Sequence, residues 1–502
     1  MTPRKGARDA VPAPQLKRQM GLWMAVALVI GNMVGSGVFL LPASLAAAAG
    51  PVSILAWVFT GVGAMLLALV FSRLGRTFPR TGGPYAFSRR AFGDFVGFQT
   101  AWGYWIAAWA GNAAITVAMV GYLAVFWPAL ATNHLLAAVV GIAVIWFLTA
   151  MNSLGVRQGA QIQLVTTILK FVPLAIVAIV GLFFVDADNL TPFAPHGTWS
   201  ALSAAAPLTM WAFIGLESAT VAAEEVKDPE RNIPRATIYG TLAATVVYLL
   251  STVVVMGVIP AGTLASSTSP FADAAGVMFG GAWTKVVALV AIAATFGALN
   301  GWILLQGRVP LAAAQDGLFP AVFAKVHGKN QTPVVGLVIS SALLSGLMLM
   351  NYTDGLVSAF TFVTLLATLT TLVPYAYSAA AQAHLLVTEP ELFDRKHFAR
   401  DLTVAAFAFL YSAWAIAGAG DDIVTKGFML LLAGIPVYVG MKWMQHRAAA
   451  KHHEVLIGTP PADDPHALPP TPAAGSAAPA PATATATDPA GHAAGGTGAL
   501  TA

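Results

Sequence analysis

Apolar runs long enough to cross a lipid bilayer recur along almost the whole chain, and no other feature constrains its fold as strongly. A helix needs about 20 mainly apolar residues to span the hydrocarbon core. Because backbone polar groups find no water in lipid, such runs predict an all-α membrane protein. We predict twelve transmembrane helices: 21–49, 52–77, 94–127, 134–153, 161–185, 202–224, 235–259, 284–313, 334–352, 356–387, 402–419 and 425–446.

The composition agrees with a multi-pass membrane protein. Hydrophobic residues make up 57% of the 502 residues and charged residues only 10%, whereas soluble domains have about 25% charged residues. The net charge of +4 provides no basic groove, so no nucleic acid partner is expected. The absence of cysteine excludes disulfides, thiolate nucleophiles and Cys-ligated zinc.

Lys and Arg collect on one side of the predicted membrane. With twelve spans, both termini and each loop from an even span to the next odd span share a side, and 23 of the 26 Lys and Arg fall there. Lys285 and Lys426 lie on the other side, and Lys170 lies inside the fifth span. Because positive charge is retained in the cytoplasm, we predict that both termini are cytoplasmic.

The two ends of the chain are predicted to lie outside the membrane. Residues 1–20 form a basic cytoplasmic segment, and the apolar run after it is too long for the core of a cleaved signal peptide. Residues 458–502 consist mainly of Pro, Ala, Thr and Gly without Lys or Arg. Such a composition cannot bury a core, so this segment is predicted to be a disordered cytoplasmic tail.

The first span contains the run GNMVGSGVFLLP at positions 31–42, whose glycines weaken a helix. If the helix is interrupted near Gly35, Ser36 and Gly37, the free amides and the positive end of the second half-helix would suit a carboxylate. Alternatively, the small residues permit close packing against a neighbouring helix.

The sixth span contains a second candidate interruption, WAFIGLES at 211–218. Spans one and six hold corresponding positions in two five-span halves, and paired interruptions of this kind indicate a transporter site. Glu217 in this segment is costly in hydrocarbon, which is typical of an ion path, or it holds the unwound backbone by hydrogen bonds. Lys170 would either titrate or replace a coupling cation, unless it snorkels to the interface.

The third span places six residues near one helical stripe, at spacings of three and four: Tyr104, Ala107, Ala108, Gly111, Asn112 and Ile115. This mixture of aromatic, small and amide groups could line a cavity for a small polar substrate. Trp302 lies in the middle of the eighth span, too far from the interface for an aromatic belt. Each aromatic side chain could equally be a packing residue.

Five long segments together resemble one family: GNMVGSGVFLLPASLA, TGGPYAFSRRAFGDFVGFQT, YWIAAWAGNAAITV, LTMWAFIGLESATVAAEEVKDPERNIPRAT and AAAQDGLFPAVFAKV. They are similar to the amino acid-polyamine-organocation superfamily and, within it, to the basic amino acid and polyamine antiporters. The resemblance covers about 21–447. It implies a LeuT-like fold of two inverted five-helix repeats, 21–185 and 202–387, followed by two further helices in 402–446, and exchange by alternating access.

The same resemblance implies roles for individual residues. Gly35, Ser36 and Gly37 would hold the substrate carboxylate, and Ile214 would receive its ammonium. Trp211 would stack on the substrate side chain, where cation–π attraction is worth about 0.5–2 kcal/mol. The other implied residues are Asn112 and Ala107 along the substrate path, Trp302 closing the cavity, and Tyr104 and Glu217 at the cytoplasmic gate.

Two positions differ from the arginine/agmatine exchangers that the sequence most resembles. Ile115 stands in place of a cavity-lining Met, and Leu365 in place of a serine that the adjacent Thr364 could replace. Lys170 instead resembles the fifth-span lysine of proton-coupled and neutral amino acid carriers. The sequence therefore predicts an amino acid antiporter, with a basic amino acid exchanged for its amine product, and leaves a Lys170-dependent proton symporter of neutral or varied amino acids as the alternative.

Other functional classes fit the sequence poorly. The spans carry no legible His-carboxylate cluster or nucleophile-base pair, so neither an enzyme nor a cofactor is expected. A receptor would need a signalling domain, and neither terminal segment looks folded. We expect an amino acid or amine as ligand and membrane lipid around a protein of the bacterial inner membrane. Family members are often dimeric, which leaves a homodimer open.

Overall fold

The computed structural model describes residues 18, 20–34, 38–79, 82–154, 174–195, 197–327, 332–351 and 355–458, with side chains to Arg447. Within these ranges the chain forms helices and no strand, and a single isolated bridge joins Met20 to Val226. Seven of the helical segments are long and apolar enough to span a membrane. The described part is therefore an all-helical, multi-pass membrane protein.

The long apolar segments coincide with predicted spans. They are Gly50–Thr77, which contains α3 (Ser53–Thr77), α5 (Asp94–Leu123), α7 (His134–Ser153), α11 (Pro229–Val258), α14 (Gly281–Gln315), α16 (Leu356–Thr388) and Asp421–Arg447. Shorter apolar helices are α1 (Leu22–Met33), the segment Leu174–Phe184 and α15 (Val334–Asn351). Helix α17 (Phe398–Ala417) has 20 residues but is not among the seven apolar segments. Length and composition together identify seven spans among the described residues, so the count of twelve stays a prediction.

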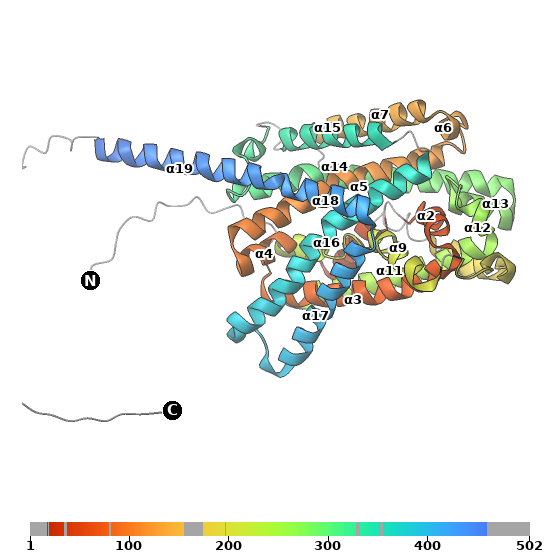
Figure 1. Cartoon of the computed structure of the whole chain (residues 1–502), viewed down its shortest axis with the longest axis horizontal. Helices are drawn as coiled ribbons and strands as arrows, with labels where there is room; N and C mark the ends of the chain where they lie inside the picture. The colour runs from red at the N-terminus through yellow and green to blue at the C-terminus, as the bar shows by residue number, and fades with distance from the viewer. Residues whose placement is uncertain are drawn as a thin grey trace, which may run out of the picture. The chain divides into compact units, whose positions relative to one another are not determined.

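Helix α5 occupies the centre of the unit formed by Met1–Gln445 and is almost entirely buried. It packs most extensively against α16 and α14. Helices α7 and α15 contact each other on one side of this core, and α3 and α11 contact each other on the opposite side (Figure 1). A helix of small and aromatic residues, such as AAWAGNAA at 107–114, lets its neighbours approach closely on all sides.

Two helices of this unit are interrupted. Helix α1 ends at Met33 and α2 (Leu41–Ala48) continues the first predicted span, while α9 (Thr198–Trp211) is followed by turns until α10 (Ser218–Val221). A Cβ on Gly215, which has a φ of +110°, would lie 2.9 Å from the Cβ of Asn32. The second interruption therefore lies against the end of α1, and only glycine suits this position.

Three features differ from the sequence prediction. The last span, predicted to end at 446, is formed by α18 (Asp421–Leu432) and α19 (Gly434–Gly458), and α19 continues 12 residues further. The residues RAAAKHHEVLI after 446 include many helix formers and no proline, so the helix leaves the apolar segment without ending. Helices α4 (Pro84–Phe92) and α13 (Pro270–Phe279) were not predicted because neither is long enough to be a span. Of the predicted tail, 459–502 lies outside the described residues.

Candidate functional site

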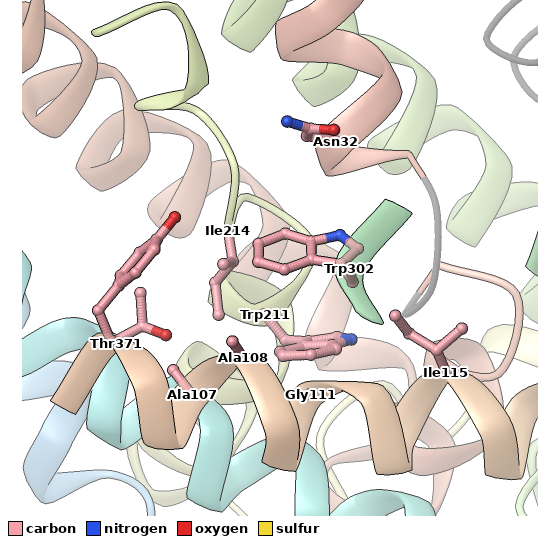
Figure 2. Close-up of a pocket in the computed structure, with 10 residues that line it drawn as sticks. Asn32, Ala107, Ala108, Gly111, Ile115, Trp211, Ile214, Trp302 and Thr371 are labelled. Carbon is pink, nitrogen blue, oxygen red and sulfur yellow. The ribbon is translucent and has the colours of Figure 1, made fainter. Parts of the chain in front are cut away.

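A small cavity lies where the two interruptions meet α5, α14 and α16 (Figure 2). Its volume, about 10 Å³ measured to the centre of a water molecule, is roughly the room that one water needs. None of the described side chains that line it is charged. They are Asn32 from α1, Tyr104, Ala107, Ala108, Gly111 and Ile115 from α5, Trp211 and Ile214 at the second interruption, Trp302 from α14, and Thr371 from α16.

One face of α5 forms the wall of this cavity. Ala107, Ala108, Gly111 and Ile115 follow one another along the helix in Figure 2, as expected for spacings of three and four residues. A Cβ on Gly111 would lie 2.7 Å from Cη2 of Trp211. The glycine is therefore required for the close approach of the indole to the helix.

Two tryptophans face the cavity from different helices. Trp211 is the last residue of α9 and is only 6% exposed, and its buried indole N–H has no hydrogen-bond partner within the described part of the chain. Trp302 in α14 is partly buried, and its ring lies on the other side of the cavity from α5 (Figure 2). Aromatic faces attract cations, so an uncharged cavity with two indoles can still favour a cationic side chain.

The end of α1 is tied to the start of α10 by a hydrogen bond. Asn32 Nδ2 donates to Ser218 Oγ at 2.7 Å. Since Asn32 also lines the cavity, one side chain contacts both interrupted helices and the space between them. A ligand that displaced Asn32 would change how the two interruptions are joined.

Glu217 lies in the second interruption and is fully buried. The hydroxyl of Tyr104 donates a hydrogen bond to Glu217 Oε1 at 2.5 Å. Tyr375 of α16 and the backbone N–H of Gly215 both donate to Oε2, the latter at 3.1 Å. The carboxyl thus joins α5, α16 and the turn segment 212–217 in one hydrogen-bond network. Glu217 lies three residues after Ile214 in the sequence.

The remaining predicted site residues lie elsewhere or outside the described ranges. Asn112 is buried beside the cavity wall and bonds to Gln306 rather than lining the cavity. Thr364 is fully buried on α16 and does not line the cavity, and none of the residues that the structure describes forms a hydrogen bond with its hydroxyl. The expected carboxylate seat at Gly35, Ser36 and Gly37, and the fifth-span Lys170, are outside the described residues.

Sequence reasoning missed Thr371 and Tyr375 on α16. Thr371 lines the cavity, and Tyr375 completes the network around Glu217. Both follow Thr364 at helical spacings of three and four residues, through Thr368. This polar stripe on an apolar helix was the available signal in the sequence. It indicated that residues one to three helical turns after Thr364 could also face the site.

Comparison with known proteins adds an independent line of evidence. A family model described as amino acid permease matches residues 20–439. A Bacillus subtilis protein named as an arginine/ornithine antiporter is 34% identical over 468 residues, covering 86% of this chain and 99% of the relative. The "Putrescine transporter PotE" of Haemophilus influenzae is 33% identical and covers 84% of this chain and 96% of its own. The "Cadaverine/lysine antiporter" of Escherichia coli is 36% identical over 369 residues, which cover 72% of this chain and 82% of the relative.

Proposed function

Because this chain belongs to the amino acid permease family, we propose that it is an antiporter that exchanges a basic amino acid for an amine. Its relatives are named for arginine, ornithine, lysine, cadaverine and putrescine, which all end in at least one cationic nitrogen. The observation that carries the proposal is the uncharged cavity between two interrupted helices with indoles on two sides. Arginine/agmatine exchange is one member of this class.

We propose that different residues around the cavity bind different groups of the substrate. The amides of Gly35, Ser36 and Gly37 would seat the substrate carboxylate, and the unwound backbone around Ile214 would accept hydrogen bonds from its ammonium. The substrate side chain would lie between Trp211 and Trp302. Since the cavity holds about one water in this conformation, at least one indole would move when substrate enters.

The network around Glu217 would close the site towards the cytoplasm. Tyr104 both lines the cavity and donates to Glu217, and Tyr375 donates to the same carboxyl. Breaking this network separates α16 from the unwound segment. Only a substrate that binds one arrangement better than the other can shift the population between outward-open and inward-open states.

The membrane topology is part of the proposal. Twelve spans, two inverted repeats over 21–185 and 202–387, and cytoplasmic termini would place the protein in a bacterial inner membrane. The concentration of Lys and Arg on one predicted side and the presence of interruptions in both halves support this arrangement.

Counterflow in proteoliposomes tests the function. Vesicles loaded with arginine, lysine, ornithine, agmatine, putrescine or cadaverine would receive labelled arginine, with and without an imposed pH gradient. Uptake only into vesicles with a trapped basic amino acid or amine is expected for the antiporter. Uptake into empty vesicles driven by external acid would instead establish the proton symporter that Lys170 suggests.

A further inference from the structure

Neighbouring residues at the second interruption have different surroundings. Trp211 and Ile214 line the cavity, whereas Phe213 between them does not and is fully buried. The ring of Phe213 packs edge-on against Trp57 of α3, with ring centres 6.0 Å apart, and against Tyr248 of α11, at 5.5 Å. One side chain of the turn segment therefore contacts two long helices outside the cavity.

Trp57, Phe213 and Tyr248 form a closed aromatic cluster. The rings of Trp57 and Tyr248 lie 5.2 Å apart, and all three side chains are fully buried. Aromatic pairs at such distances attract each other beyond the gain from burial. Because 212–217 has turns in place of a regular helix, the aromatic cluster determines where this segment lies against α3 and α11.

Two polar atoms of the aromatic cluster are buried and form no hydrogen bond within the part of the chain that the structure describes. They are the indole N–H of Trp57 and the hydroxyl oxygen of Tyr248. Such groups are rare, because each gives up the hydrogen bonds that it makes in water. Phenylalanine would fill the place of Tyr248 without that loss, so the hydroxyl calls for an explanation.

The backbone of the turn segment offers suitable partners for this hydroxyl. Thr209 near the end of α9 is fixed to Thr60 of α3 by a 2.7 Å hydrogen bond. Beyond it the backbone forms turns, in which Leu216 N–H bonds to the carbonyl of Phe213, and such positions can absorb changes in backbone angles. Since the Phe213 ring packs on Tyr248, a change in these turns moves backbone carbonyls relative to the Tyr248 hydroxyl.

We propose that Tyr248 is a positioning residue for the turn segment during exchange. In the conformation described here its ring holds Phe213. When the network around Glu217 opens, the Tyr248 hydroxyl donates a hydrogen bond to a backbone carbonyl of 212–217 and so stabilises the arrangement that is open to the cytoplasm. This inference rests on the proposed function, since it concerns the segment that is proposed to move between the two access states.

Tyr248→Phe removes the hydroxyl and keeps the ring. No hydrogen bond of the described conformation is lost, so the midpoint of thermal unfolding should equal or exceed that of the wild type. The chain contains no cysteine, so Ala222→Cys, five residues after Glu217, reports opening to the cytoplasm by its rate of thiol labelling in detergent with arginine present. We expect this rate to fall about two- to tenfold in Tyr248→Phe, the equivalent of one hydrogen bond in the open arrangement.

Tyr239→Phe is the matched control. It makes the same substitution on α11 at a side chain that is 47% exposed, and it should leave the labelling rate unchanged. A double-mutant cycle with Phe213→Leu tests whether the hydroxyl acts on the turn segment. Because Phe213 holds that segment against Tyr248, Tyr248→Phe should change the labelling rate much less in the Phe213→Leu background. If Phe213→Leu does not fold, Phe213→Met takes its place in the cycle.

The outcomes separate this inference from the proposed function. Labelling of Tyr248→Phe at the wild-type rate or faster would overturn the positioning role while exchange persists. Additive effects in the cycle would also overturn it, because the hydroxyl would then act through water or another helix. Failure of the wild type to exchange any of the loaded substrates in counterflow would refute the antiporter, whereas slower labelling in Tyr248→Phe would still support two arrangements of the turn segment.

Discussion

The contact between Gly111 and Trp211 yields a prediction whose size follows from the geometry. A Cβ added at Gly111 would lie 2.7 Å from Cη2 and 3.2 Å from Cζ3 of Trp211. Carbon atoms without a bond between them prefer about 3.5–4.0 Å, so in Gly111→Ala the indole must retreat by about 1 Å. The adjacent space is the cavity itself, whose volume is about 10 Å³.

Two opposing contributions determine how much Gly111→Ala changes the free energy of unfolding. Adding a methyl group to a packed interior costs about 1–3 kcal/mol, whereas replacing glycine by alanine inside a helix returns about 0.5–1 kcal/mol. The free energy of unfolding of Gly111→Ala should therefore be lower than that of the wild type by at most about 2.5 kcal/mol. A displaced indole also narrows the site, and a penalty of about 1–2 kcal/mol in the bound state would weaken substrate binding about 5- to 30-fold.

Gly301→Ala is the matched control. It changes glycine to alanine in α14, next to Trp302, where an added Cβ would meet nothing within 4 Å. Competition counterflow and thermal unfolding in detergent would be measured for both variants. We expect weakened binding in Gly111→Ala and wild-type binding in Gly301→Ala. Equal affinities in the two variants would show that the Trp211 ring does not define the cavity.

Further substitutions probe the other parts of the site. Trp211→Leu should abolish substrate binding while the protein remains folded, measured by equilibrium binding and size-exclusion chromatography; retained affinity would remove this residue from the site. Tyr375→Phe deletes one of the three donors to Glu217 described above and should destabilise the closed state of the cytoplasmic side by about 1–3 kcal/mol. The change would be measured as increased labelling of a cysteine introduced on the cytoplasmic side of Glu217. Unchanged labelling would argue against a gate. Lys170→Ala should flatten the pH dependence of transport if this lysine carries the proton, and an unchanged profile would assign it a structural role.

The sequence was sufficient to predict the helical class and the wall of the cavity. Runs of about 20 apolar residues have few alternatives in lipid, and the spacing of Tyr104, Ala107 and Gly111 places them on one face of α5 whatever its neighbours are. The interruption before Ser218 also carried a local signal, since a glycine and a carboxylate stand together in an apolar span. Local chemistry thus predicted local structure.

The partners across helices could not be predicted in this way. Nothing near Gln306 in sequence indicates that it meets Asn112, which lies 194 positions earlier. Tyr375 reaches Glu217 across 158 positions, and α16 carries so many hydroxyl groups that Thr364 and Thr371 were equally plausible. Which residue of a polar stripe faces the cavity depends on the rotation of the helix against its neighbours, and single-sequence periodicity does not fix that rotation.

In the proposed mechanism, substrate recognition and closure meet in one short segment. Trp211 and Ile214 line the cavity at one end of the unwound stretch, and Glu217 at its other end joins Tyr104 and Tyr375. Since only six positions separate Trp211 from Glu217, a substrate that moves the indole also acts on the backbone that holds the carboxyl. Coupling between sites requires an element with two arrangements that both sites bias. The segment 212–217 between α9 and α10 has turns in place of a regular α-helix, with i to i−3 hydrogen bonds such as Ile214 N–H to Trp211 C=O. Substitutions there should therefore alter affinity and gating together, and Gly111→Ala, which displaces the Trp211 indole, should also alter both.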